Sequence, residues 1–360
     1  MKGVKNNLAN TSVKRNGLLV LKVIMDVCRG RADKLLGTEF KTIGEQVFYM
    51  AKEGKMLSLF CNFIDYFPIE FQPYLEKRCS LTDLYLKYLE IISEELNNEG
   101  VEYYIFKTIK PFAYDMTDID ILIIEKKDML ITSGILMKKL GFRVVSKGTY
   151  SLTFRKTING FDIDIDLQSR ISAGTFEYIF VSETKRIIGN IGYTKNGLSL
   201  LKPELELAII AGHVFFKDLS VSLADLISAD YLIKTADKKT LITILEHNKH
   251  MSTPFSMMYY LTNVFERIFS DDLQSYPSDK CSPKLILLAR HSLNQLRECN
   301  GRIIIPIFLS IEIYLETLAT LIEEHHYKQL LEIVEMPQSR GIKLFFRRLG
   351  FLSQEEAIRV

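Results

Sequence analysis

The chain has 360 residues, of which 47% are hydrophobic and 25% are charged, an ordinary globular composition that excludes long disorder and fibrous architectures. Lys and Arg number 46 and Asp and Glu 44, so the net charge is only +2, and we expect any nucleic-acid contact to use a local patch. No stretch is long, apolar and free of charge, and the first residues lack a secretory leader, so we expect no transmembrane segment and a cytoplasmic location.

The first part of the chain reads as helical. Residues 1–16 are basic and polar and predict a mobile basic arm, and residues 17–80 predict an N-terminal helical region that ends near two prolines. Ser80, with Asp83 three residues later, predicts the cap of a further helix. The five cysteines are odd in number and contain no C-x-x-C pair, which predicts reduced thiols rather than a disulfide framework.

Residues 81–200 change character and predict a small α/β domain. A helix is expected from Leu81 until just before Gly100, and a second helix ends at Gly141. Asn159-Gly160 is a hairpin dipeptide that joins two strands. The expected strands cover residues 101–106, 118–124, 142–145, 150–154 and 161–167, with the second helix at 126–140.

Residues 201–360 predict a C-terminal helical domain, with Pro203 in the first turn of its first helix. Near the end, Arg340 to Phe351 is basic with interleaved aromatic residues. That segment fits docking on the preceding helices, stacking on nucleic acid, or lying on a membrane surface.

The most informative pattern is a pair of acidic strands. Asp118 and Asp120 flank one isoleucine, and side chains two apart on a strand point to the same face. A later strand carries Asp162, Asp164 and Asp166 in the same alternation. If the strands are neighbours, a third carboxylate meets the first pair, and oxygen ligands of this kind hold Mg²⁺ in phosphoryl and nucleotidyl transfer.

A plainer interpretation is also open. Alternating Asp and Ile is typical of an exposed edge strand, where charges discourage pairing with another chain. Two such strands side by side would, however, crowd like charges and destabilise the sheet, so we favour a functional site.

With these residues in view, residues 81 to about 235 resemble the nucleotidyltransferase superfamily with the DNA polymerase beta-like fold, in particular stand-alone members with a D-I-D-I-L strand and a later D-L-H strand. The D-x-D matches Asp118 and Asp120, and Asp166-Leu167-Gln168 stands in place of D-L-H. Lys107-Thr108-Ile109 stands where the family has its Gly-Ser turn, and nine residues separate Thr108 from Asp118. The glycine and the histidine of the family are therefore missing. A third similarity covers Leu201 to Leu219, with the L-A-D-L of Leu223 to Leu226 after it.

The resemblance implies an α/β (α+β) nucleotidyltransferase core with a mixed sheet, flanked by mostly α-helical N- and C-terminal regions. It implies Asp118, Asp120 and Asp166 as ligands of Mg²⁺ (Mn²⁺ as a substitute), with Asp166, or alternatively Asp164, as the acid that helps to deprotonate the acceptor.

On the same resemblance, Lys107, Thr108, Lys110 and Lys217 are the candidates for phosphate contacts, Thr108 through its hydroxyl. Taken alone, the sequence favours a solvated lysine beside Asp218 for Lys217 and a packed histidine for His213.

The implied activity is transfer of a nucleoside monophosphate from an NTP donor to an acceptor hydroxyl or phosphate. The acceptor is open, with RNA, tRNA or a protein among the options. The degenerate turn also motivates a second hypothesis, a catalytically silent fold that binds RNA or a protein partner, and a toxin–antitoxin or defence role is a third. The chain contains no P-loop and no G-x-G-x-x-G or G-x-S-x-G motif.

Overall fold

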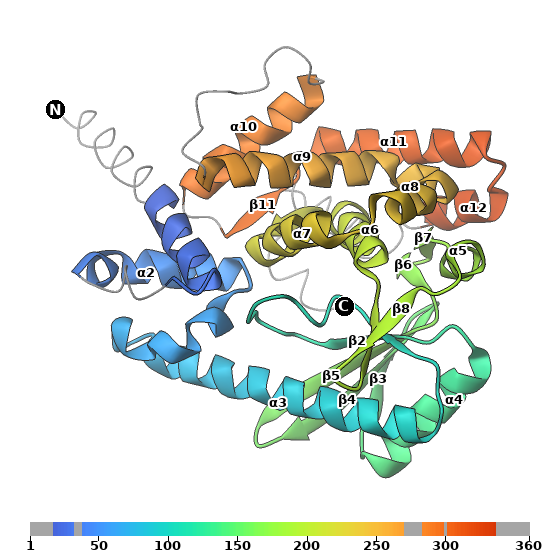
Figure 1. Ribbon diagram of the computed structural model, residues 1–360, viewed down its shortest axis with the longest axis horizontal. Coiled ribbons are helices and arrows are strands. Elements are labelled where there is room, and N and C mark those ends of the chain that lie inside the picture. Colours follow the sequence, from blue (N-terminus) through green and yellow to red (C-terminus); the bar gives the residue numbers. More distant parts are fainter. Residues whose placement is uncertain (1–16, 32–37, 270–282, 299–300, 336–360) are drawn as a thin grey trace.

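The computed structural model describes residues 17–31, 38–269, 283–298 and 301–335 (Figure 1). The protein has a mixed α/β fold, with one seven-stranded mixed sheet and helices before and after it in the sequence. The basic segments at residues 1–16 and at Arg340 to Phe351 lie outside the described residues. None of the helices within the described ranges combines the length and the apolarity that crossing a membrane requires.

The N-terminal helices lead into one long helix. They comprise a helix at residues 17–28, α2 (Thr38–Glu53), the 3-10 segment η2 (Leu57–Tyr66) and α3 (Gln72–Asn98). α3 has a proline in its first turn, and its buried residues, among them Tyr85, Leu89, Ile92 and Leu96, recur every three or four positions.

The helix start that we expected at Ser80 is wrong. Ser80 lies inside α3, where its hydroxyl donates a hydrogen bond to the Glu76 carbonyl at 2.9 Å. A serine that bonds the carbonyl one turn back has the same sequence context as a cap, so the local pattern was ambiguous. α3 therefore runs across the boundary expected at residue 80.

The expectation of reduced thiols is also wrong for one pair. Cys61 of η2 and Cys79 of α3 form a disulfide, and Cys28 is free and half-buried. The two cysteines are 18 residues apart on segments that pack against each other, and no short spacing motif marks such a pair. The other two cysteines lie outside the described residues.

The main sheet has the strand order β3-β4-β5-β2-β1-β9-β8. β2 and β5 pair in parallel, as do β1 and β9, and the other neighbours are antiparallel. The expected hairpin at Asn159-Gly160 is confirmed, since both residues have positive φ, +51° and +80°. The strands are β1 (Tyr104–Ile105), β2 (Ile119–Leu122), β3 (Arg143–Lys147), β4 (Ser151–Ile158), β5 (Phe161–Gln168), β8 (Gly192–Lys195) and β9 (Leu198–Leu201).

β8 and β9 of the main sheet were not expected, and neither were two small pairs of strands outside it. β6 (Ile171–Ala173) pairs with β7 (Phe176–Ile179), and β10 (Ser220–Ser222) pairs with β11 (Arg302–Ile304).

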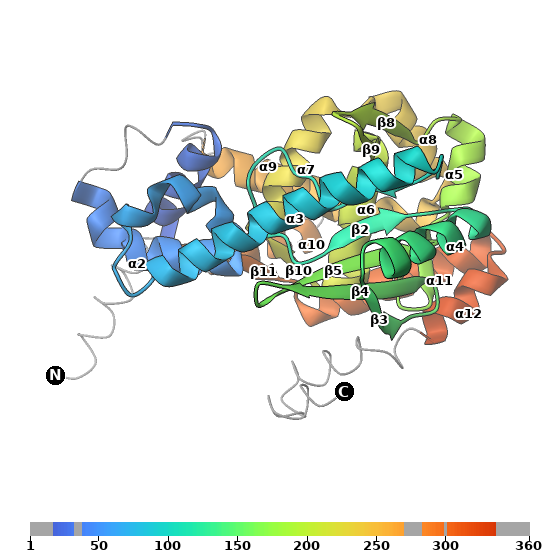
Figure 2. The ribbon, with the colours of Figure 1, turned by 90° about the horizontal axis from the view of Figure 1, so that it is seen from below.

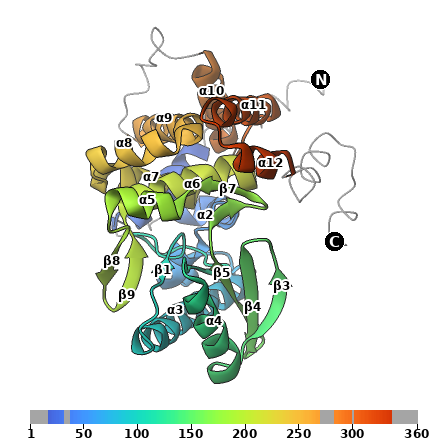
Figure 3. The same ribbon diagram turned by 90° about the vertical axis from the view of Figure 1, so that its right-hand side faces the viewer.

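Helices cover both faces of the sheet. α3 lies along one face, where it contacts β5 and β9 (Figure 2), and α4 (Lys126–Gly134) lies on the same side. The C-terminal helices gather on the opposite side (Figures 1 and 3). They are α6 (Pro203–Gly212), α7 (Leu223–Thr235), α8 (Lys238–His247), α9 (Ser252–Phe269), α10 (Pro283–Arg297), α11 (Ile307–Glu323) and α12 (Tyr327–Glu335), and α5 (Val181–Ile188) precedes them.

Two of these helices position the site. α6 begins at Pro203, as expected, and continues as a π-helical turn, η4 (His213–Asp218). α7 begins with a capping box, in which the Ser222 hydroxyl accepts from the Asp225 N–H and the Asp225 carboxylate accepts from the Ser222 N–H. The carboxylate of Asp225 is thereby fixed beside the loop that precedes β2.

Candidate metal centre and anion-binding cavity

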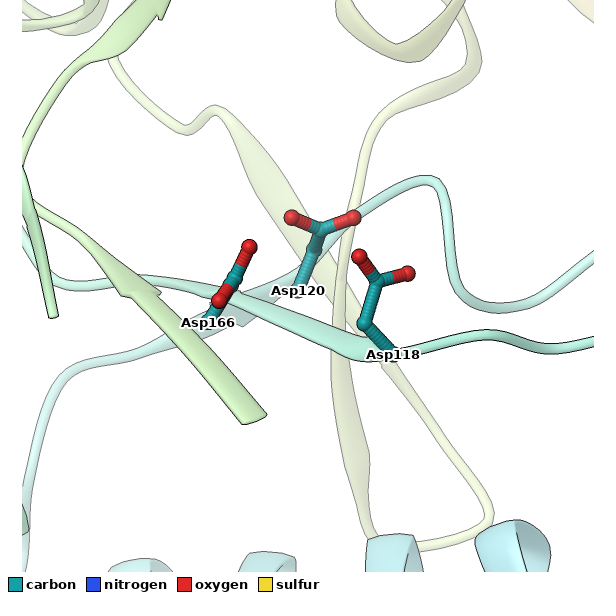
Figure 4. A group of neighbouring side chains, drawn as sticks. All are labelled: Asp118, Asp120 and Asp166. Atoms are coloured by element: carbon teal, nitrogen blue, oxygen red, sulfur yellow. The ribbon is translucent and has the colours of Figure 1, made fainter. Parts of the chain in front are cut away.

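Three aspartates converge on one side of the sheet. Asp118 directly precedes β2, Asp120 lies in β2, and Asp166 lies opposite Asp120 in the register of β2 and β5. Each offers a carboxylate oxygen, and these oxygens lie within 4.8 Å of one another. Figure 4 shows the three carboxylates pointing to the same side of the strands. The expected meeting of a third acid with the D-x-D pair is confirmed, and the acid is Asp166.

The alternative acid, Asp164, lies outside this cluster. Its two carboxylate oxygens accept hydrogen bonds from Arg155 of β4, both at 2.6 Å. The edge-strand interpretation is wrong for both acidic strands, because β5 lies between β4 and β2, and β2 lies between β5 and β1.

The acid cluster holds negative charge that the protein leaves partly uncompensated. Burial, and then the charge of Asp120, raise the pKa of Asp118. Burial raises the pKa of Asp166 as well, against a hydrogen bond from Thr153, with Asp118 adding to the rise. The Oδ1 atom of Asp166 is buried and has no hydrogen-bond partner. Three convergent carboxylates, one with an unsatisfied buried oxygen, fit a hard divalent cation such as Mg²⁺.

Asp120 is held by groups on both sides. Gln168 Nε2 donates to Asp120 Oδ1 at 2.6 Å, and Lys107 Nζ forms an ion pair with Asp120 Oδ2 at 3.0 Å. Gln168 stands where the resemblance expects a histidine, and here it orients the second acid of the D-x-D pair. Burial disfavours the positive charge of Lys107, whereas Asp120 and other anionic groups favour it. The second effect is larger, so the pKa of Lys107 rises above its usual value.

The turn before the cavity takes the left-handed backbone that the missing glycine would favour. Lys107 has φ +57°, and its N–H donates to Glu206 Oε1 at 2.6 Å. The Tyr114 hydroxyl bridges the carbonyls of Lys107 and Thr108 at 3.1 and 2.7 Å. Side chains of α6 and of the loop that follows the turn therefore fix its conformation.

Thr108 has a different role from the one we expected. Its hydroxyl donates to the Phe106 carbonyl at 3.1 Å and accepts from the Asp120 N–H at 2.8 Å. Thr108 is only 1% exposed and does not line the cavity. In this structure the hydroxyl therefore ties the turn to β2 and is not free to face a phosphate.

A cavity of about 200 Å³ opens beside the acid cluster, between the turn, η4 and the start of α7. Asp118 and Asp120 line it together with four lysines, which are Lys55, Lys107, Lys110 and Lys217. Lys110 Nζ lies 3.4 Å from Asp225 Oδ1. Burial alone would raise the pKa of Asp225. The charges of Lys110 and Lys55, with the hydrogen bonds from Ser222, outweigh burial and hold this pKa below its usual value.

Lys217 and His213 lie on η4 at the same cavity. The positive charge of Lys107, followed by burial, lowers the pKa of Lys217. Burial, then the charges of Lys107 and Lys217, hold the pKa of His213 well below its usual value, so this imidazole is neutral at neutral pH.

Sequence reasoning missed two residues of the site. Lys55 follows Gly54 in a segment without a P-loop pattern, and Glu206 is one of two acids in the apolar helix α6. Neither lies near the D-x-D strand in sequence, so no local spacing pointed to them.

No match to this chain was found among protein-family models, curated proteins or solved structures, so its function is argued from the geometry of the site.

Proposed function

We propose that this protein is a metal-dependent nucleotidyltransferase with a polymerase beta-like core, which moves a nucleoside monophosphate from an NTP to an acceptor hydroxyl or phosphate. The observation that carries the proposal is the combination of two opposite charges at one cavity. Asp118 and Asp120 line the cavity next to Asp166, and four lysines line the same cavity. A metal-bound polyphosphate has the same two requirements.

The residues of the site would have separate roles in this reaction. Asp118, Asp120 and Asp166 would hold Mg²⁺ or Mn²⁺, which, when bound, supplies Lewis-acid activation and neutralises phosphate charge. Lys107, Lys110 and Lys217 face the polyphosphate. Asp166 also accepts the proton of the acceptor. The acceptor oxygen forms a bond to the α-phosphorus, the bond from that phosphorus to the bridging oxygen breaks, and pyrophosphate leaves with the electron pair.

The test is release of pyrophosphate and transfer of label from each of the four α-labelled NTPs, with Mg²⁺ and with RNA or protein offered as acceptor. Asp118→Asn combined with Asp120→Asn should abolish transfer, because two of the three carboxylates lose their charge. Asp164→Asn is the matched control, since Asp164 lies on β5 but pairs with Arg155 outside the cluster. Unchanged transfer in the double variant would refute the proposal.

One observation favours a second candidate, a silent fold that binds RNA or a protein. The Lys107 N–H and the Thr108 hydroxyl, which a phosphate would use, are already bonded within the protein. This candidate predicts that no NTP raises the melting temperature of the protein, with or without Mg²⁺, whereas ligand binding to the native state must raise it. A shift that requires Mg²⁺ and disappears in Asp118→Asn would exclude the silent fold.

A further inference from the structure

The charged groups around the cavity are not evenly paired. Asp120 pairs with Lys107, and Asp225 pairs with Lys110. Asp115, which also lines the cavity, is held by Arg78 at 3.2 Å and by the backbone N–H and hydroxyl of Ser58. Of the two other carboxylates of the cavity, Asp118 belongs to the acid cluster and Asp218 lies 3.8 Å from His213, so neither holds a lysine in an ion pair.

Two further lysines of the cavity take no part in these ion pairs. Within the described ranges, neither Lys55 nor Lys217 forms an ion pair with a carboxylate. Lys217 comes from η4, whereas Lys55 comes from the turn between α2 and η2, in the N-terminal helical region. A lysine that faces the cavity without an ion-pair partner keeps its amine available for contact with an anionic ligand.

The turn that carries Lys55 is held in place by the rest of the protein. Lys55 has a left-handed backbone, with φ +60°, and its carbonyl accepts from the Asp115 N–H at 2.9 Å. The Gly54 carbonyl accepts from the Ala224 N–H, at the start of α7, at 3.1 Å. A non-glycine residue in this conformation is unfavourable unless its surroundings fix it.

Close packing fixes the same turn from another side. A Cβ atom on Gly301 would lie 1.9 Å from the Met50 carbonyl oxygen and 2.4 Å from the Gly54 nitrogen. The loop before β2, the start of α7 and the loop before β11 therefore all meet this turn. A flexible lysine on a rigid turn is thereby aimed at the cavity.

We infer that Lys55 binds the polyphosphate of the substrate, so that the N-terminal helical region completes the anion-binding side of the site. The inference rests on the proposed function, and it adds a substrate contact from a segment outside the expected core. The ligand class is an inorganic or nucleoside polyphosphate. Lys55 and Lys217 supply for it the two amines of the cavity that no carboxylate of the described residues holds in an ion pair.

The probe is inorganic tripolyphosphate without Mg²⁺, titrated into the full chain by calorimetry at fixed salt. Lys55→Asn removes the charge while keeping a residue that tolerates the left-handed backbone, and it should weaken binding about tenfold, the effect of losing one charge-assisted contact. Lys55→Arg should bind within about threefold of wild type, since the charge remains. Lys22→Gln, an exposed lysine of the same region that does not line the cavity, should bind like wild type.

The fold is checked separately by the urea unfolding midpoint. Lys55→Gly relieves the backbone conformation and should unfold at a urea concentration no lower than wild type, yet bind tripolyphosphate as weakly as Lys55→Asn. Equal affinities of wild type, Lys55→Asn and Lys55→Gly would overturn the inference, and so would absence of tripolyphosphate binding by wild type.

The proposed function has its own readout. Metal-free tripolyphosphate binding that depends on Lys55 stands even if Asp118→Asn combined with Asp120→Asn transfers as well as wild type, a result that would refute only the role of the acid cluster in transfer. Conversely, metal-dependent transfer with affinities unchanged in Lys55→Asn would refute only the role of Lys55.

Discussion

Asp118 shows how one side chain of the acid cluster can destabilise the folded protein. Its raised pKa means that the native state disfavours its charge at neutral pH, through burial and the neighbouring Asp120. Asp118→Asn should therefore stabilise the metal-free protein by about 1 kcal/mol, seen as a higher melting temperature in EDTA, although it abolishes transfer.

Asp164→Asn gives the opposite expectation on β5. It breaks the ion pair with Arg155 and should lower stability by about 0.5 kcal/mol, because the pair is partly exposed.

The outcome that would contradict the Asp118 prediction is a lower melting temperature of Asp118→Asn in EDTA. It would show that the charge of Asp118 does not destabilise the metal-free protein.

Glu206 makes the stability of the turn depend on pH. Burial raises its pKa from 4.5 to about 7, against the Lys107 N–H and nearby lysines. Because the folded pKa lies above the unfolded one, this carboxyl lowers the free energy of unfolding as pH rises from 4.5 to about 7, and the loss persists above that. Glu206→Gln removes the titration and keeps an oxygen for the Lys107 N–H.

Between pH 4.5 and pH 8, the free energy of unfolding of Glu206→Gln should rise by about 2 kcal/mol relative to that of wild type. This value is reduced to allow for the partial exposure of the carboxyl. Urea unfolding at the two pH values measures it. A difference between variant and wild type that is the same at both values would show that Glu206 does not titrate in this range.

The sequence predicted the acids of the site better than their partners. Asp118, Asp120 and Asp166 could be placed together because side-chain alternation along a strand is visible in the sequence. The partner residues are harder, since Glu206 reaches Lys107 across 99 positions and Asp115 reaches Ser58 across 57. Such contacts depend on tertiary packing, which a local pattern does not encode.

Among the elements, the junction of α6 and β7 depends on a glycine with ordinary helical backbone. A Cβ atom on Gly212 would lie 2.3 Å from the ring of Tyr178, a buried residue of β7. Gly212→Ala should therefore destabilise the protein by about 2 kcal/mol, because the packed ring has to shift. The free energy of unfolding in urea measures the change.

Gly134→Ala in α4 is the matched control. Gly134 also has helical φ and ψ, but a Cβ atom there meets nothing within 4 Å. Alanine should stabilise α4 by about 0.5 kcal/mol. Similar effects of the two substitutions would mean that Tyr178 does not pack on Gly212 as described.

Most elements of the expected core were predicted, and the misses have identifiable causes. The β8–β9 hairpin has Asn196-Gly197 at its turn, with φ +50° and +79°, so the dipeptide signal was present but the flanking strands are short. β10 and β11 pair Ser220 with Ile304, and a three-residue strand with so distant a partner leaves no periodic pattern.

Considered as one unit, the protein has a hydrophobic core without an internal break. Buried side chains from Val20 in the first helix to Ile333 in α12 form one contiguous cluster. Hydrogen bonds of the Gly54-Lys55 turn to Ala224 and Asp115 tie the N-terminal region to it. We expect a single calorimetric unfolding transition whose midpoint agrees for helix and tyrosine signals. Two separated transitions would show that the N-terminal region unfolds independently.

The ion pair between Lys107 and Asp120 has a consequence for how two ligands would influence each other. The same amine is needed by a phosphate, and the same carboxylate is needed by a cation. A phosphate that draws Lys107 away leaves Asp120 free for a cation, and a cation at Asp120 leaves Lys107 free for a phosphate. Because linkage is reciprocal, each ligand should strengthen the binding of the other by the same factor. Titrations with Mg²⁺ and tripolyphosphate, separately and together, would measure this coupling, and Lys107→Met should remove it.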